Sequence, residues 1–251
     1  MTMHLLVDSG NSRLKWSWWA RGKLFGRQGV AGGKRLSIDI LDSNWGAFVS
    51  PPKGVWIANV AGAGVAALLA RWIESRWGLE PVFVTSQAEG CGVTNGYDNP
   101  ERLGVDRWLA LIGAFHHYPL PACIVDCGTA LTLDVLDRQG RHRGGLISPG
   151  LALMTQSLGK GTADIGLDVA VLSSKGRLGR ETSQAIGLGI RHAAAGLIER
   201  VMEDMATELP DLRLILTGGD AGDVAAFLRK AFIAAPELVL QGLAVVSQEH
   251  E

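Results

Sequence analysis

The strongest constraint on the fold is an internal repeat, with one copy at the head of each half of the chain. Residues 5–19 read LLVDSGNSRLKWSWW, and residues 123–137 read CIVDCGTALTLDVLD. Both copies run from apolar residues to Asp, one further residue and Gly, and then through Asn or Thr into a strand-like alternation. They begin 118 residues apart in a chain of 251 residues. We therefore expect a duplicated fold in which each half opens with a two-stranded hairpin.

Short apolar runs alternate with helical patterns behind each hairpin. In the first half, residues 55–60 predict a buried strand, and residues 65–77 predict a helix with one apolar face. In the second half, residues 183–205 predict a long helix and residues 214–216 a further strand. Strands and helices interleaved in this way indicate an α/β architecture.

Two prolines mark the boundary between the halves. In the segment Tyr118-Pro119-Leu120-Pro121 they interrupt both the helical and the strand periodicity. Since each half carries one copy of the repeat, we expect two domains that cover residues 1–118 and residues 119–251.

Composition excludes several classes of protein. Hydrophobic residues make up 47% and charged residues 20% of the chain, which is ample for a core and excludes disorder. Lys and Arg number 24 against 25 Asp and Glu, so the net charge of -1 gives no footprint for nucleic acid or an anionic membrane. The three cysteines form no CxxC pair, and no apolar run is long enough for a membrane helix. These features predict a reduced, globular, cytoplasmic protein without a disulfide framework or zinc site.

The turn after the first apolar run has the composition of an anion-binding loop. Gly10 allows a tight turn that presents backbone N–H groups, and Asn11 and Ser12 add side-chain donors. Lys15 lies on the outgoing strand within reach of the same anion, and Asp8 suits a hydrated magnesium ion beside it. The alternative is an ordinary hairpin whose Asn and Ser side chains bond their own backbone.

Two further loops favour a phosphate site. Residues 126–129, Asp-Cys-Gly-Thr, echo the first loop, and two such loops facing each other across a cleft would hold a polyphosphate from both sides. A third loop, Thr217-Gly218-Gly219-Asp220, follows a strand and opens towards a helical stretch. Its position suits the adenosine or the α-phosphate of a nucleotide.

Three phosphate-type loops in a duplicated α/β chain resemble the actin, hexokinase and acetate kinase ATPase superfamily. Residues 95–108, NGYDNPERLGVDRW, look like the motif of type III pantothenate kinases: Tyr, then Pro, then Leu-Gly-x-Asp-Arg-Trp. The two Asp-x-Gly loops, residues 144–150 and residues 182–189 match further segments of that family in order. Ser12 replaces the usual Thr and keeps the hydroxyl, while Glu181 stands where the family usually has Asn.

The resemblance implies a fold, a reaction and partners. The expected fold is a pair of actin/hexokinase-like (ribonuclease H-like) domains with a cleft between them. The expected reaction is ATP-dependent phosphorylation of pantothenate to 4'-phosphopantothenate, the first step of coenzyme A biosynthesis, with magnesium accompanying ATP. A homodimer is implied too, and the small residues Ala193, Ala194, Ala195 and Gly196 would permit close helix approach. Neither nucleic acid nor a membrane is an expected partner.

The resemblance also assigns site residues. Asp106 would be the general base that takes the proton of the substrate's primary hydroxyl, chiefly by orienting it in a loose transition state. Arg107 carries a planar fork suited to an anionic or carbonyl group of the substrate. The implied ATP-binding residues are Asp8, Ser9, Gly10, Asn11, Ser12, Arg13, Leu14, Lys15 and Thr129. The implied substrate-binding residues are Tyr97, Gly104, Val105, Asp106, Arg107 and Thr182.

Asp126 is the residue to which the resemblance assigns a monovalent cation, potassium or ammonium. It ends an apolar strand, so its carboxylate is expected to be partly desolvated and to need a partner charge. No Lys or Arg lies within ten residues on either side. One carboxylate with backbone carbonyls suits a large monovalent ion better than a divalent one. The alternative is that Asp126 caps its own loop through the N–H groups of Gly128 and Thr129.

Two other classes of function stay open at this point. Some proteins of this family are named Bvg accessory factors for effects on transcription, so a non-catalytic regulator on the same fold is one alternative. Residues 62–67, GAGVAA, fit the Gly-x-Gly-x-x-Ala form of a dinucleotide fingerprint and give the second, a dinucleotide-dependent oxidoreductase. The following strand ends in Thr85-Ser86-Gln87 without an acid for a ribose, which favours a simple strand-to-helix turn.

Overall fold

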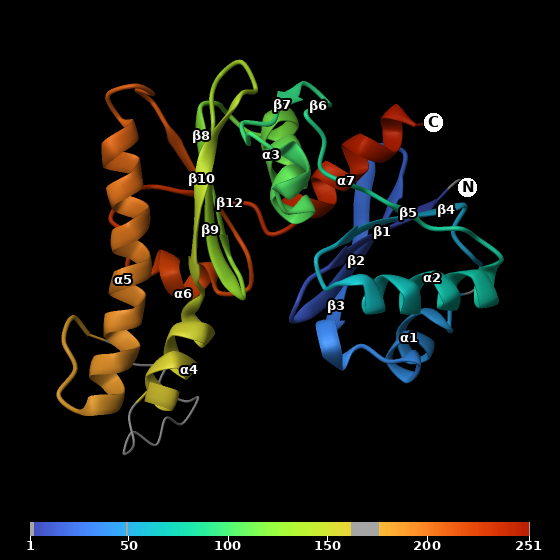
Figure 1. The fold of residues 1–251 in the computed structure, drawn as a ribbon, viewed down its shortest axis with the longest axis horizontal. Helices are drawn as coiled ribbons and strands as arrows, with labels where there is room; N and C mark the ends of the chain where they lie inside the picture. Colours follow the sequence, from blue (N-terminus) through green and yellow to red (C-terminus); the bar gives the residue numbers. More distant parts are fainter. Residues whose placement is uncertain (1–2, 49, 162–175, 251) are drawn as a thin grey trace. The chain divides into compact units, whose positions relative to one another are not determined.

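The structure is a computed structural model that describes residues 3–48, 50–161 and 176–250 (Figure 1). The chain divides into two compact units. The first contains residues 1–118, 139–142 and 237–251, and the second contains residues 119–138 and 143–236. One boundary between the units falls at the proline seam, while the C-terminal helix groups with the first unit. The ATPase domains expected at residues 1–118 and 119–251 stay a prediction.

The first unit is a five-stranded sheet with helices on both faces (Figure 1). Its elements are β1 (His4–Ser9), β2 (Arg13–Ala20), β3 (Lys23–Ala31), η1 (Gly33–Arg35), α1 (Ile38–Trp45), β4 (Gly54–Asn59), α2 (Ala63–Trp77), β5 (Val82–Phe83), β6 (Glu89–Gly90), β7 (Val93–Thr94), η2 (Pro100–Arg102), α3 (Val105–His117) and α7 (Leu238–Glu249). The strand order is β3-β2-β1-β4-β5. β1 pairs antiparallel with β2 and parallel with β4, so the predicted hairpin is confirmed.

Alternation along β1 sorts its side chains between two layers. Leu5 and Val7 join a tryptophan-rich core with α1 and α2, in which the rings of Trp16 and Trp45 meet edge to face at 5.7 Å. The opposite face of the sheet is covered by α3 and α7. These two helices cross so closely that a Cβ on Gly113 would lie 2.5 Å from the carbonyl oxygen of Leu238. The helix that begins beside Asp106 is therefore fixed by the C-terminal helix.

The second unit repeats this plan. Its elements are β8 (Ala122–Cys127), β9 (Ala130–Leu136), β10 (His142–Pro149), α4 (Leu151–Gly161), α5 (Thr182–Met205), β11 (Arg213–Thr217), α6 (Ala221–Ala225) and β12 (Ile233–Ala234). The strand order is β10-β9-β8-β11-β12, with β8 antiparallel to β9 and parallel to β11. Replacing β1 to β5 by β8 to β12 converts one order into the other. The duplicated α/β fold expected from the repeat is thus confirmed.

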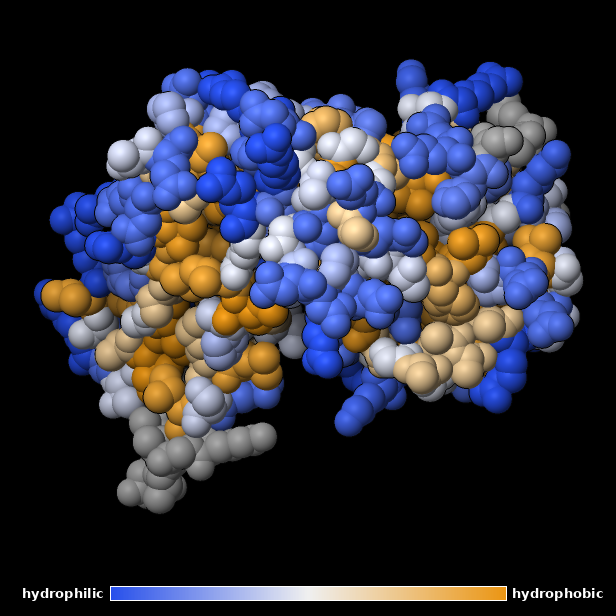
Figure 2. Space-filling view, turned by 45° about the horizontal axis from the view of Figure 1, so that its top comes forward, coloured by the Kyte–Doolittle hydropathy of each residue, from blue (hydrophilic) through white to orange (hydrophobic). Residues whose placement is uncertain are grey.

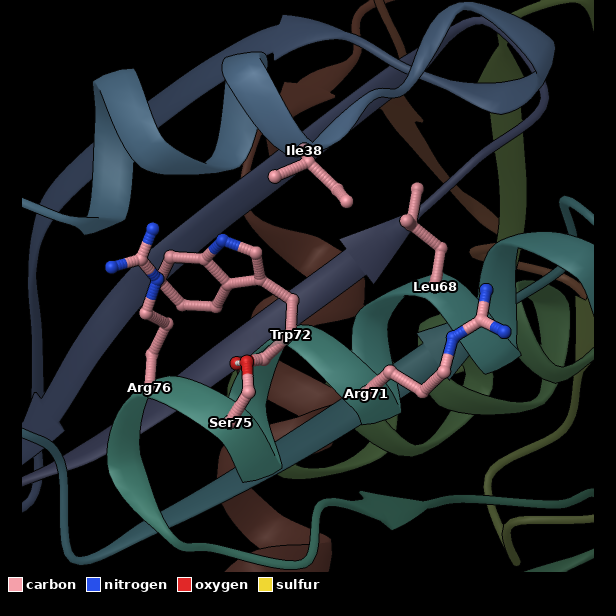
Figure 3. Close-up of a pocket in the computed structure, with 6 residues that line it drawn as sticks. All are labelled: Ile38, Leu68, Arg71, Trp72, Ser75 and Arg76. Atoms are coloured by element: carbon pink, nitrogen blue, oxygen red, sulfur yellow. Dashed lines mark hydrogen bonds between the residues drawn. The ribbon is translucent and has the colours of Figure 1, made fainter.

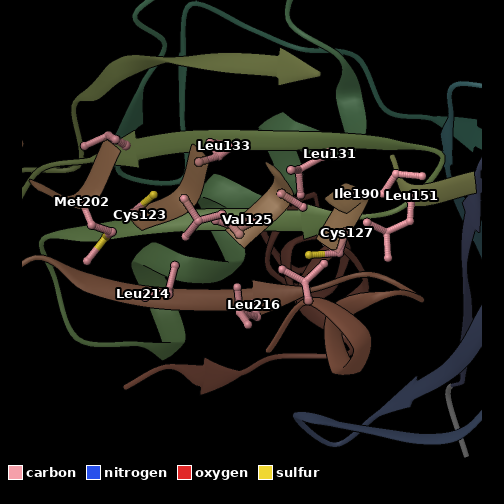
Figure 4. Packing of buried hydrophobic residues seen from close by; sticks show 14 residues of the cluster. Cys123, Val125, Cys127, Leu131, Leu133, Leu151, Ile190, Met202, Leu214 and Leu216 are labelled. Carbon is pink, nitrogen blue, oxygen red and sulfur yellow. The ribbon is translucent and has the colours of Figure 1, made fainter. Parts of the chain in front are cut away.

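The core of the second unit lies between its sheet and α5 (Figure 4). Leu131, Leu133 and Val135 on β9 all face this core, as their alternation predicts. α5 is 24 residues long and contributes Ile190 and Ile198 to the same cluster. Neither α5 nor any other helix in the described part of the chain is long and apolar enough to span a membrane.

Candidate nucleotide and substrate site

The β1–β2 turn carries most of the predicted nucleotide-binding residues. The N–H of Gly10 donates to the carbonyl of Arg13 at 3.0 Å and closes the turn. The segment after β3 braces it, because the carbonyl of Ser12 accepts from the N–H of Gly32 at 3.0 Å and from the Arg35 guanidinium at 3.1 Å. The turn is therefore held in one conformation by backbone bonds, which suits a loop that presents N–H groups to an anion.

Gly33 sets how closely this brace approaches the turn. Its φ is +60°, in the left-handed region that favours glycine. A Cβ at this position would overlap the carbonyl oxygen of Asn11. The segment from Gly32 to Arg35 can contact the turn only because residue 33 has no side chain. The side chain of Asn11 is exposed to solvent.

Asp8 and Lys15 lie opposite each other on β1 and β2. Lys15 Nζ is 3.2 Å from Asp8 Oδ2, and Asp8 is only 6% exposed. The ammonium group offsets the cost of burying the carboxylate. Lys15 is half-buried at the mouth of the turn, where it can also reach an anion held by the loop.

Ser9 has a different orientation from its neighbour Asp8. By strand alternation its side chain lies on the same face as Leu5 and Val7, and it is 1% exposed. Its hydroxyl has no hydrogen-bond partner among the described residues. Ser9 and its cross-strand partner Leu14, which is 1% exposed in the same core, therefore have only their backbones available on the side of the turn.

Asp106 lies in the first turn of α3, where its carboxylate accepts the N–H of Arg107 at 2.8 Å. Burial raises the pKa of Asp106, the hydrogen bond from Arg107 opposes this, and the negative charge of Asp8 raises it further. The predicted general base and the predicted nucleotide-binding Asp8 are thus close enough to interact electrostatically. A raised pKa brings the carboxylate nearer to the range in which proton transfer is efficient.

Arg107 and Tyr97 form a pair beside this carboxylate. The Arg107 guanidinium donates to Tyr97 Oη at 2.7 Å, and its central carbon lies 5.4 Å from the centroid of the Tyr97 ring. Arg107 is only 6% exposed. Gly104 is so close to the carboxylate that a Cβ there would lie 2.7 Å from Asp106 Oδ1, and Val105 is buried behind it. The structure therefore brings together the five predicted substrate-binding residues of the first unit.

Two residues in this cluster were not singled out from the sequence. Asn95 is buried, accepts the N–H of Tyr97 at 3.0 Å and donates to the carbonyl of Gln87. Its place before Gly96 is a turn signal that could have been used. His142 is 3% exposed and stacks on the Tyr97 ring. No local sequence pattern predicts the contact between His142 and Tyr97, because the two residues are 45 positions apart in the chain.

The β8–β9 turn of the second unit resembles the first turn and is one residue shorter. The N–H of Gly128 donates to the carbonyl of Ala130 at 3.1 Å, and the N–H of Gly150 donates to the carbonyl of Thr129 at 3.0 Å. Thr129 itself is exposed at the tip. Asp126, at the end of β8, is half-buried, as its position predicts.

The third predicted loop packs against Asp126. Thr217 lies opposite Asp126 in the parallel pair of β8 and β11. A Cβ on Gly218 would lie 2.5 Å from Asp126 Oδ1, and the N–H of Asp220 donates to the carbonyl of Cys127 at 2.9 Å. Burial raises the pKa of Asp220, and the charge of Asp223 raises it further. Two of the predicted loops are thus neighbours in one unit.

The donor set fits the cations that the resemblance implies. The described residues contain no group of three or more His, Cys, Asp or Glu side chains that could hold a metal ion. Magnesium that accompanies ATP keeps several waters and needs one or two carboxylates plus phosphates, which Asp8 can supply. A large monovalent ion needs one carboxylate and carbonyl oxygens, the groups that surround Asp126.

Thr182 is the first residue of α5, and Glu181 precedes it as the N-cap residue. The hydroxyl of Ser183 donates to Glu181 Oε1 at 3.1 Å. Thr182 belongs to the second unit, whereas Tyr97 and Arg107 belong to the first. Its predicted role beside them in a substrate pocket stays a prediction.

A groove of about 590 Å³ lies in the first unit between α1 and α2 (Figure 3). Figure 3 shows its lining, which consists of Ile38, Leu68, Arg71, Trp72, Ser75 and Arg76. None of the predicted site residues lines this groove. It is therefore separate from the cluster around Asp106.

The Gly62 turn, the basis of the oxidoreductase alternative, is a strand-to-helix connection between β4 and α2. The Asn59 side chain accepts the N–H of Ala61 at 3.3 Å and donates to the carbonyl of Gly62 at 3.1 Å. The turn thus satisfies its own polar groups, as the simple strand-to-helix interpretation expects.

Comparison with known proteins agrees with this geometry. The family model for type III pantothenate kinases matches residues 4–204. A type III pantothenate kinase of Nitrosococcus oceani is 41% identical over 98% of this chain and 94% of its own length. Among solved structures, a candidate 2-dehydro-3-deoxygalactonokinase from Sinorhizobium meliloti superposes with a TM-score of 0.59 at 15% identity, covering 98% of this chain and 96% of its own.

A candidate transcriptional activator of the Baf family from Campylobacter jejuni superposes with a TM-score of 0.58 at 20% identity, covering 98% of both chains. Likenesses at such low identity concern the fold, and they agree with actin/hexokinase-like domains. The family model spans more than half of this chain, and the relative from Nitrosococcus oceani matches nearly all of it. This chain belongs to the type III pantothenate kinase family.

Proposed function

We propose that this protein transfers the γ-phosphoryl group of ATP to the primary hydroxyl of pantothenate, giving 4'-phosphopantothenate for coenzyme A biosynthesis. The observation that carries the proposal is Asp106, whose carboxyl accepts the N–H of Arg107, interacts with the charge of Asp8 and has a pKa raised by burial. The substrate comes from family membership, since the relative at 41% identity is named a type III pantothenate kinase.

The residues of the first unit have complementary tasks in this reaction. Asp106 accepts the proton of the attacking hydroxyl and fixes its direction, which is the main requirement when the transition state is loose. Arg107 binds an anionic or carbonyl group of pantothenate with its planar fork. Tyr97, Gly104 and Val105 complete the substrate side of the cluster, and Thr182 contributes from α5.

The nucleotide is held by two turns of the same construction. The β1–β2 turn, from Asp8 to Leu14, offers N–H groups, and Lys15 offers an ammonium group to the phosphates. Asp8 would hold the hydrated magnesium ion that accompanies ATP, and that ion would supply positive charge beside the transferred group. Thr129 contacts the phosphates from the β8–β9 turn, where Asp126 would hold a potassium or ammonium ion.

A homodimer and a cytoplasmic location belong to the same proposal. Apolar side chains gather on the visible surface of the second unit in Figure 2, and its exposed large apolar residues include Leu146, Ile147, Leu153 and Leu158. In the small-residue stripe of α5, Ala194 and Ala195 are buried in their own unit, so only Ala193 and Gly196 are exposed to a second copy. Light scattering that gave the monomer mass of 26.7 kDa would contradict the dimer.

The test of the reaction is a coupled ADP-release assay with pantothenate and a panel of other small hydroxyl acceptors. ADP release with pantothenate well above that with every other acceptor is the expected result. Release at the same low rate with all acceptors would show that pantothenate is not the substrate. The regulator alternative is not favoured, because Asp8, Asp106, Asp126 and Thr129 are all present and the matched relatives are named kinases.

A further inference from the structure

We propose that His142 is a positioning residue for the substrate side of the site, acting through Tyr97 on Arg107. The inference rests on the proposed function, which places pantothenate against those two side chains. The role of His142 is to hold the Tyr97 ring.

His142 arrives on a segment that is tightly docked in the first unit. Residues 139–142 are the end of the β9–β10 connection and the first residue of β10, yet they group with the first unit. The N–H of Thr94 donates to the carbonyl of Gly140 at 2.9 Å, and Thr94 pairs with Arg141 in a parallel bridge. Gly140 packs so closely that a Cβ there would overlap the carbonyl oxygen of Gly92. These restraints fix the backbone of the residue immediately before His142.

The imidazole restrains Tyr97 in two ways. Its ring stacks on the Tyr97 ring with a centroid distance of 5.8 Å and an angle of 18° between the planes. Its Nδ1 accepts the N–H of Gly96, the residue before Tyr97, at 3.4 Å. With Nδ1 as the acceptor, the neutral ring carries its proton on Nε2. One buried side chain therefore limits both the ring and the adjoining backbone of Tyr97.

Tyr97 transmits this restraint to Arg107. The other contacts of the Tyr97 ring described here are with the Arg107 guanidinium, which donates to Tyr97 Oη at 2.7 Å. Arg107 is buried, so the direction of its planar fork depends on such neighbours. Loss of His142 would leave Tyr97 free to change rotamer and would misdirect the fork that binds the substrate. The effect should fall on pantothenate and spare ATP.

Three substitutions separate the two restraints. His142→Phe keeps a ring that can stack and removes the acceptor, whereas His142→Asn keeps an acceptor near the position of Nδ1 and removes the ring. His142→Ala removes both. His192→Ala is the matched control, because His192 also packs against an aromatic ring, that of Phe227 at 5.1 Å, but lies in the second unit.

The experiment measures steady-state kinetics with each substrate varied in turn, together with the melting temperature of each variant. In His142→Ala the KM for pantothenate should rise roughly tenfold, with kcat changed by less than about twofold and the KM for ATP unchanged. The Phe and Asn variants should show intermediate rises, since each keeps one restraint. The double variant that combines His142→Ala with Tyr97→Ala should have the same KM for pantothenate as Tyr97→Ala alone, because His142 acts through Tyr97.

Two results would overturn the inference while leaving the function intact. One is a KM for pantothenate that stays at the native value in all three His142 variants. The other is a parallel loss for ATP and pantothenate with a lowered melting temperature, which would indicate a structural role only. If the unmodified protein releases no ADP with pantothenate, the proposed function fails, and the inference fails with it. Because only that last result involves the unmodified protein, the two failures are distinguishable.

Discussion

The β1–β2 turn of the first unit and the β8–β9 turn of the second are held by similar hydrogen bonds, and they differ by one residue in length and in charge. In both, a glycine N–H closes the turn, through Gly10 in one and Gly128 in the other. In both, the residue just after the third strand of the sheet braces the turn through its N–H, Gly32 after β3 and Gly150 after β10. The duplication thus includes the hydrogen bond from the segment after the third strand as well as the hairpin itself.

The charges around the two aspartates are what differ. The residue opposite Asp8 is Lys15, which makes an ion pair at 3.2 Å. The residue opposite Asp126 is Thr132, which is neutral. The first hairpin therefore places an ammonium group across the strands from its aspartate, whereas the second places a neutral hydroxyl group there.

The largest effect that distinguishes the two units is expected at the base, which only the first unit carries. Asp106→Asn should lower kcat about 100-fold or more, because the amide cannot accept the hydroxyl proton. Binding of ATP and pantothenate, measured by calorimetry, should persist. Asp98→Asn is the control, since Asp98 is an exposed carboxylate of the same motif. Near-normal turnover in the Asp106 variant would show that Asp106 is not the general base.

The next effect concerns the ion at Asp126. At fixed ionic strength and saturating magnesium, we expect rates in potassium or ammonium to exceed those in sodium by about tenfold or more, because the larger ion suits one carboxylate with carbonyl oxygens. Asp126→Ala should lose both activity and the response to potassium. Equal rates in sodium and potassium would support the alternative in which Asp126 only caps its own turn.

The comparison between the hairpins can be tested by transplanting the charge. Thr132→Lys places an ammonium group opposite Asp126, as Lys15 is placed opposite Asp8. The ratio of rates in potassium and sodium should then fall towards one, within about twofold, because the built-in cation replaces the dissolved one. Thr132→Met controls for side-chain length. A ratio unchanged in both variants would show that the cross-strand position does not determine the ion requirement.

A smaller effect is expected in the pH profile. Asp106 must be ionised to act as a base, and burial together with the charge of Asp8 raises its pKa. The rate should therefore fall on acidification at a higher pH than an ordinary aspartate would give. In Asp8→Asn the negative charge is lost, so the remaining activity should fall at a lower pH, shifted by about one unit or less. A shift to higher pH would contradict this interaction.

The smallest effects are expected at the two turn glycines. A Cβ on Gly10 would lie 3.3 Å from the carbonyl oxygen of Arg13, and one on Gly128 would lie 3.2 Å from Asp126 Oδ1. Each Gly→Ala change should lower the free energy of unfolding by about 1 kcal/mol or less, measured by urea denaturation. Only the change at Gly128 should also weaken the response to potassium, since it alone approaches the carboxylate. Equal cation responses in both variants would argue against the difference between the turns.

The hairpins, their turns and the helix that carries Asp106 could all be predicted from the sequence, because each is determined by local alternation and by glycine. The inward direction of Ser9 was predictable as well, since it has the same parity as Leu5 and Val7 on β1. The motif around Tyr97 indicated which residues would gather, and five of them do so within one unit.

The features that escaped prediction depend on contacts between segments far apart in the chain. The stacking of His142 on Tyr97 and the brace from Gly32 to Ser12 leave no periodic pattern behind. The close crossing of α3 and α7 could not be predicted from the sequence either. A glycine within a helix has several possible causes, and only the structure shows that another helix packs against it here. Periodicity reports which face of an element is buried, and it does not identify the partner element.

That crossing has a consequence for biosynthesis of the protein. α7 is made of residues 238–249, and α3, which carries the predicted general base at its start, is made of residues 105–117. A Cβ on Gly113 would lie 2.5 Å from a carbonyl of α7, and one on Gly242 would overlap a carbonyl of α3, so the fit depends on both helices. Before residues 238–249 are synthesised, α3 lacks the helix that packs against it. We therefore expect the segment that begins at Asp106 to reach its final position only after residue 249 has emerged from the exit tunnel.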